Sequence, residues 1–137
     1  MIPIFPRSRE ITDAFGARLR IGVERHPLGP LVTLEHPDRR GQPRALLDSY
    51  GTEILAGFIM AARLALPGTM PDEHAAGTFP LRLRLARVPG IAIILTQAEL
   101  ERPFLIAATF WDRLYAELCL VGAHARQLSR RVDMSVH

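Results

Sequence analysis

The fold of this chain is decided by residues 43–66, which read PRALLDSYGTEILAGFIMAARLAL. Residues 45–47 are apolar, and the longer part after Asp48 contains no proline and few polar side chains. We interpret the stretch as a short strand that turns directly into an apolar helix. Sixty residues later, residues 103–126 repeat the pattern as PFLIAATFWDRLYAELCLVGAHAR.

The two stretches align without a gap, which suggests an internal duplication. Identical or similar residues occupy the pairs Pro43 and Pro103, Leu46 and Ile106, Ser49 and Thr109, Tyr50 and Phe110, Ile54 and Leu114, Ala56 and Ala116, and Phe58 and Leu118. Upstream, residues 31–34 align with 91–94, and residues 19–25 with 81–87. The alternative is a chance similarity, because apolar residues replace one another freely in any two strand–helix segments.

Hydroxyl side chains stand where both helices are expected to begin. Ser49 and Thr109 occupy these positions, and a hydroxyl there accepts a hydrogen bond from a free backbone N–H of the first turn. Asp112 follows Thr109 at the spacing of a capping box. The sequence therefore predicts Ser49 and Thr109 as the N-caps of the two helices.

Alternating apolar and polar residues are typical of strands with one buried face. Strands are expected over residues 18–25, 31–36, 45–48, 81–88, 91–95 and 103–110, and helices over 50–66 and 111–130. Residues 11–16 suggest a helical turn. Residues 91–95 are continuously apolar, and so are residues 103–110 apart from Thr109, which indicates strands covered on both faces.

These elements predict an α+β fold of two tandem β-β-β-α repeats related by a pseudo-two-fold axis. The sheet is expected to be antiparallel, because short connections join its strands, and both helices should pack on one face. We interpret residues 1–137 as a single domain. Its expected parts are an N-terminal arm (1–17), repeat one (18–66), a linker (67–80), repeat two (81–131) and a tail (132–137).

The amino-acid composition is that of an ordinary folded domain and does not indicate a particular function. The chain has 137 residues, of which 48% are hydrophobic, and this is enough for a core. All 17 basic residues are arginine, and the net charge is +3. A mildly basic balance permits a nucleic-acid or other anionic partner without requiring one.

The sequence lacks the motifs that are typical of several functional classes. Cys119 is the only cysteine, so no internal disulfide is expected, and no signal peptide or apolar run long enough for a membrane span occurs. Glycine-rich phosphate loops, nucleophile elbows and metalloprotease motifs are absent as well. We therefore expect a cytoplasmic protein that is not an enzyme, with no cofactor, no metal and no membrane partner.

Two histidine motifs leave weaker alternatives open. Glu24-Arg-His26-Pro and Glu35-His36-Pro flank the first expected hairpin, and two His with two Glu are conceivable metal ligands. His before Pro is also an ordinary strand-end pattern. A small-ligand or enzymatic site would require His26, His36 or Asp48 to converge in a pocket.

The amount of apolar surface predicts self-association. The helix over 50–66 is apolar on nearly every face, and one sheet can cover only one of those faces. We expect a homo-oligomer, or an adaptor with another protein partner, that uses apolar helix and strand surfaces. The candidate interface residues are Phe58, Ile59, Ile93, Leu95, Trp111 and Tyr115.

A second candidate function uses arginines on strands. Arg18 and Arg20 alternate with apolar residues in the first repeat, as do Arg82 and Arg84 in the second. If all four project from the sheet face opposite the helices, they could follow a phosphate backbone. The alternative is that they form the solvated face of the sheet.

In expected topology, the doubled strand-and-helix unit resembles the repeats of single-stranded nucleic-acid binders such as the whirly and Pur proteins. That resemblance implies a sheet surface that binds single strands. Those repeats usually have more strands than the three expected here, and their motifs are absent from this chain.

Overall fold

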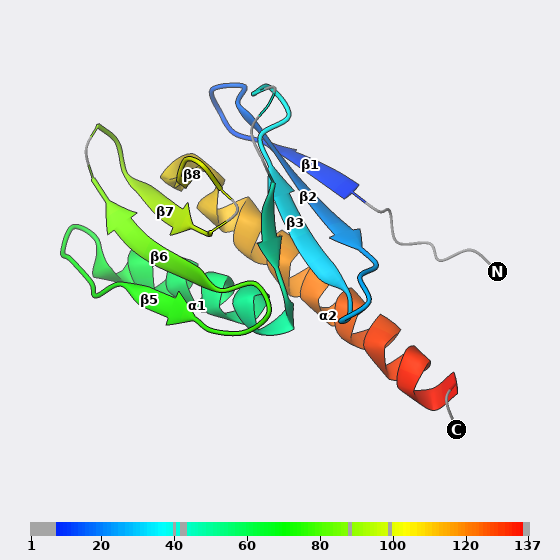
Figure 1. Ribbon diagram of the computed structural model, residues 1–137. Helices are drawn as coiled ribbons and strands as arrows, with labels where there is room; N and C mark the ends of the chain where they lie inside the picture. The colour runs from blue at the N-terminus through cyan, green and yellow to red at the C-terminus, as the bar shows by residue number, and fades with distance from the viewer. Residues whose placement is uncertain (1–7, 40, 42–43, 88, 99, 136–137) are drawn as a thin grey trace.

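A computed structural model describes residues 8–39, 41, 44–87, 89–98 and 100–135, with side chains described as far as Gln127. Within these residues, a run of four strands followed by a helix occurs twice along the chain (Figure 1). The first run contains β1 (Ser8–Thr12), β2 (Arg18–Glu24), β3 (Leu31–Glu35), β4 (Ala45–Leu47) and α1 (Ser49–Ala65). The second contains β5 (Glu73–Ala75), β6 (Leu81–Ala86), β7 (Ala92–Thr96), β8 (Phe104–Ala107), a 3-10 turn (Ala108–Phe110) and α2 (Trp111–Ser135).

The strands form two separate antiparallel sheets, each in sequence order: β1-β2-β3-β4 and β5-β6-β7-β8. The α+β class, all six expected strands and both expected helices are confirmed. Each sheet nevertheless has four strands instead of three, because β1 lies in the expected arm and β5 in the expected linker. Backbone helix also continues to Ser135, into the expected tail.

The two additional strands carry little apolar signal. Ile11 in β1 and Ala75 in β5 are the single buried residue of their strands. The helical turn expected over 11–16 is wrong, because β1 ends at Thr12 and a tight hairpin turn follows. The Asp13 carboxylate accepts backbone hydrogen bonds from Phe15 and Ala17 in that turn, and Gly16 has the left-handed φ of 84° that favours glycine.

Each helix packs against strands of the sheet that does not precede it directly in the chain. In Figure 1, α1 lies against β5 and β6 of the second sheet and also contacts β3 and β4, whereas α2 lies against β2 and β3 of the first sheet. The inner side chains of both sheets and both helices form one continuous core. The two runs of strands and helix therefore share a single core, and each depends on the other for burial of its apolar face.

Two ion pairs join the helices and show their relative direction. Arg63 near the end of α1 lies 2.9 Å from Asp112 at the start of α2. Glu53 near the start of α1 lies 3.5 Å from Arg126, further along α2. The helices are therefore antiparallel neighbours.

The expected helix caps are both wrong. α1 is capped by Asp48, whose carboxylate accepts a hydrogen bond of 2.7 Å from the Gly51 N–H, and Ser49 is already inside the helix. A carboxylate one residue earlier makes the same contact that the hydroxyl was expected to make. Thr109 lies in the 3-10 turn before α2, and its hydroxyl donates to Asp13 at 2.7 Å.

Candidate functional site

The four predicted nucleic-acid-binding arginines lie in two different sheets. Arg18 and Arg20 belong to β2 in the first sheet, and Arg82 and Arg84 belong to β6 in the second. All four point away from the core, because the residues between them, such as Leu19 and Leu83, are fully buried. Their electrostatic surroundings differ sharply.

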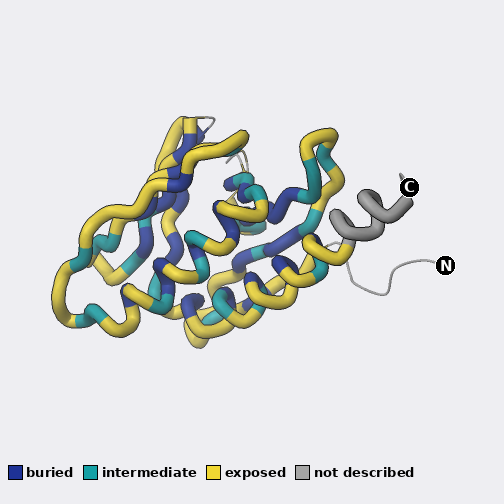
Figure 2. The backbone as a smooth tube through the Cα atoms, turned by 90° about the horizontal axis from the view of Figure 1, so that it is seen from below, coloured by how far each residue is buried: buried dark blue, intermediate teal, exposed yellow. Residues whose placement is uncertain are grey.

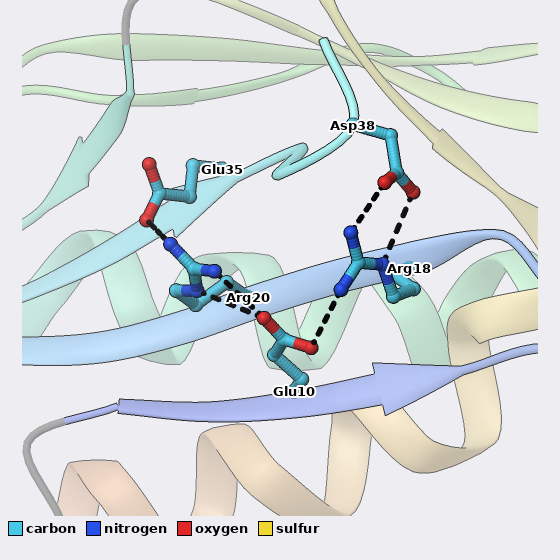
Figure 3. A network of polar contacts seen from close by, with 5 residues as sticks. All are labelled: Glu10, Arg18, Arg20, Glu35 and Asp38. Atoms are coloured by element: carbon cyan, nitrogen blue, oxygen red, sulfur yellow. Dashed lines mark hydrogen bonds and ion pairs between the residues drawn. The ribbon is translucent and has the colours of Figure 1, made fainter. Parts of the chain in front are cut away.

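The first pair is neutralised by neighbouring carboxylates (Figure 3). Arg20 contacts Glu10 at 2.7 Å and Glu35 at 3.0 Å, and Arg18 contacts both Glu10 and Asp38. The hydrogen bond from Arg20 lowers the pKa of Glu10, and the hydrogen bond from Arg18 lowers the pKa of Asp38. Two positive charges thus face three negative ones, so the net charge of this patch is negative.

The charges of the second pair, Arg82 and Arg84, are not neutralised by any described carboxylate. Arg82 and Arg84 are exposed, and their side chains form no hydrogen bond or ion pair with any other described residue. Arg82 lies opposite His74 on β5 and Thr96 on β7, and Arg84 lies opposite Ile94. The outer face of the second sheet is therefore the positively charged one.

The predicted interface residues are mostly inside the chain. Phe58, Ile59, Ile93, Leu95 and Trp111 are at most 2% exposed, and Tyr115 is half-buried. The five buried residues make their contacts within one copy of the chain, whereas part of Tyr115 is accessible. The sequence pattern could not separate the faces of α1, because apolar side chains occur all around that helix.

Exposed apolar side chains occur instead on the outer surface of the helices. Tyr50 and Leu64 on α1 are 52% and 84% exposed, and Leu120 on α2 is 52% exposed. Figure 2 shows the exposed outer surface of both helices from below. We call this surface the helix layer, formed by Tyr50, Gly57, Ala61, Leu64, Ala116, Leu120 and Ala123.

A cleft of about 330 Å³ lies between the turns of the first sheet and the second sheet. We call it the inter-sheet cleft. One wall is charged and comes from the turns of the first sheet, with Asp13, Arg18, His36, Asp38 and Arg39. The other wall is apolar and comes from the outer face of the second sheet, with Ala86, Ile91, Ala92, Ile94, Leu105, Ala107 and Phe110 among its residues.

His36 joins the two walls. Its Nε2 lies 2.9 Å from the carbonyl oxygen of Leu105, and its ring stacks on Phe104 with centroids 4.4 Å apart. A carbonyl only accepts, so Nε2 carries the proton. Burial lowers the pKa of His36, and the ring is therefore neutral at pH 7. His36 thus connects the first sheet to the second without adding charge to the cleft.

Gln97 makes a second connection that the sequence did not reveal. Its side chain is 5% exposed, accepts from the Leu46 N–H at 2.9 Å and donates to the Leu46 carbonyl at 2.6 Å. Leu46 belongs to β4, the edge strand of the first sheet, and Gln97 directly follows β7 of the second. A glutamine after a strand carries no periodic signal, so only the fold identifies its role.

The other candidate ligand residues do not meet. His26 contacts Phe79 edge-on at 5.4 Å, Asp48 caps α1, and of the three only His36 lines the cleft. The described residues contain no group of three or more His, Cys, Asp or Glu side chains able to hold a metal ion. No helix within the described residues has the length and apolar character needed to span a membrane.

Comparison with known protein families finds no matching family model, and comparison with curated proteins finds no related sequence.

Proposed function

We propose that this protein is a non-enzymatic binding protein that self-associates through its helix layer. The observation that supports this most directly is the exposure of Leu64 at 84%, with Tyr50 and Leu120 each at 52%. Large apolar side chains gathered on one surface are typical of protein contacts. The interface thus lies on the helices, and strand surfaces contribute less than the sequence suggested.

The arrangement of the helix layer favours a second helical layer as its partner. Tyr50, Gly57 and Leu64 recur every seven residues, so they share one face of α1. The ion pairs at the two ends of the helix pair show its register, and this register places Leu120 beside the middle of α1. Exposed Gly57 and Ala116 leave room for close approach of another helix.

The distribution of charge on the helix layer favours a second copy of the chain as its binding partner. The charged residues of this surface lie toward the ends of the helix pair. Arg63 is paired with Asp112 and Arg126 with Glu53, and Arg113 donates to the Thr12 carbonyl. The centre of the surface carries no charge. Two copies packed face to face would bury the apolar centre, form a layer of four helices and leave the sheets outside.

Replacing Leu64 and Leu120 together by glutamate is expected to weaken self-association at least about tenfold, because two charges per copy would be buried in an apolar contact. Analytical ultracentrifugation over a micromolar concentration series measures this. Phe15→Glu is the matched control, because Phe15 is also 84% exposed but lies in the β1–β2 turn. A monomeric wild type, or equal loss in the control, would contradict the proposal.

A second candidate function is nucleic-acid binding by the outer face of the second sheet. Its support is that Arg82 and Arg84 are exposed and make no ion pair within the described residues. The four strands of each sheet also remove one difference from whirly and Pur repeats. We infer that a duplicated β-β-β-β-α unit with a pseudo-two-fold axis underlies this arrangement.

Arg82→Gln with Arg84→Gln is expected to reduce binding to single-stranded DNA. It should also make the slope of log affinity against log salt shallower by about 1.4, because each lost phosphate contact contributes about 0.7. Fluorescence anisotropy at several salt concentrations measures both. Arg63→Gln with Arg126→Gln removes the same charge from the helix layer and should leave the slope unchanged. Equal effects of the two double variants would rule out a specific sheet surface.

A further inference from the structure

We propose that the inter-sheet cleft binds a small molecule that has an apolar body and a single carboxylate. The cleft is distinct from the helix layer and from the outer face around Arg82. Its volume of about 330 Å³ lies within the range of small-molecule pockets. Its two walls differ in chemistry, and each wall specifies one part of the ligand.

The apolar wall would receive the body of the ligand. Ala92 and Ile94 lie on the outer face of β7, paired in register with Ala107 and Leu105 of β8. Leu105 is 42% exposed, although it lies on a strand whose run of apolar residues predicted cover on both faces. Covering apolar area contributes about 25 cal/mol per Å². A flat apolar group between the sheets would supply the cover that the chain itself leaves incomplete.

The charged wall would receive the carboxylate, because Arg39 offers unoccupied N–H donors while the oxygens of both acids already accept hydrogen bonds. The Asp13 carboxylate accepts hydrogen bonds from Phe15, Ala17 and Thr109. Asp38 is paired with Arg18. Both acids of this wall therefore have partners already.

Arg39 is the remaining charged group of this wall, and it forms no ion pair with any described residue. A guanidinium binds a carboxylate through two parallel N–H donors, so one exposed arginine matches one carboxylate. His36 is neutral and held by Leu105 and Phe104, so it shapes the cleft without competing for the anion. Both carboxylates of this wall already accept hydrogen bonds, which leaves few free oxygen lone pairs for a cationic ligand.

Methyl-labelled full-length protein titrated with phenylacetate and with the neutral phenylacetamide tests this inference by NMR. The two probes share their apolar body, so their difference reports the carboxylate. We expect saturable shifts of the Ala92, Ile94 and Leu105 methyl groups, with phenylacetate binding up to about fivefold more tightly than the amide. Arg39→Gln should abolish that preference while keeping amide binding.

Two further variants separate the cleft from other surfaces. Ala92→Phe places a ring against the apolar wall and should abolish binding of both probes, with the fold checked by the unchanged methyl spectrum of the helices. Arg25→Gln removes an exposed arginine that follows β2 and does not line the cleft, and it should keep the preference for phenylacetate. The inference is overturned if neither probe shifts the cleft methyl groups at millimolar concentration. Equal binding of acid and amide, or equal effects of Arg39→Gln and Arg25→Gln, would overturn it too.

Discussion

Replacing Phe58 by alanine is expected to lower the free energy of unfolding by about 3–5 kcal/mol, the usual cost of removing a buried phenylalanine. Phe58 is 2% exposed on α1 and belongs to the core shared by both sheets. Deleting its ring removes apolar contacts and leaves a cavity, because neighbouring backbone cannot close fully around an alanine. Urea denaturation at one fixed protein concentration measures the loss.

The control for this variant is Phe15→Ala, which deletes the same ring from a side chain that is 84% exposed. That change should alter stability by less than about 0.5 kcal/mol, as is usual for surface positions. The comparison also separates the two interpretations of Phe58. If Phe58→Ala changed self-association and left stability near the wild-type value, Phe58 would belong to an interface and its position in the core would be wrong.

Replacing Gln97 by alanine is expected to cost about 2–4 kcal/mol, since each buried backbone group left without a partner costs roughly 1–3 kcal/mol. The variant would leave the N–H and the carbonyl of Leu46 without the hydrogen bonds that they form with the Gln97 amide. Because this amide joins β4 to the end of β7, the loss should also loosen the contact between the sheets. Denaturation curves and amide hydrogen exchange at Leu46 measure the two effects.

Thr96→Ala is the matched control for Gln97, because Thr96 is the preceding residue and is exposed. Its stability should stay within about 0.5 kcal/mol of wild type. If the rate of amide hydrogen exchange at Leu46 were unchanged in the Gln97 variant, water would replace the side-chain amide without loss of stability. Gln97 would then not connect the two sheets.

Most of the secondary structure could be predicted from the local alternation of apolar and polar residues. Alternation over Leu19, Ile21 and Val23, and again over Leu81, Leu83 and Leu85, identified strands whose apolar sides do face the core or lie at its edge. β1 and β5 were missed because edge strands bury few side chains and so carry weak periodicity. Arg9, for example, faces α2 from β1 and lies 3.2 Å from Glu117, a contact that local sequence cannot reveal.

The candidate sites were less predictable, because charge and exposure depend on neighbours from distant segments. Arg20 and Arg82 looked equivalent in sequence. Arg20 is neutralised by Glu10 and Glu35, which pairing in the sheet places on either side of it. Arg82 has His74 and Thr96 at the corresponding positions. The inter-sheet cleft was also invisible, since its walls come from separate sheets.

By itself, the sequence determined that this chain is an α+β protein with an apolar helix after each set of strands, because such patterns depend on the period of the backbone. Only the tertiary structure decided that each helix crosses to the other sheet, which placed Phe58 in the core and left Leu64 outside. The reason is physical: periodicity states that a face must be buried, whereas the partner that buries it is chosen by the packing of the whole chain.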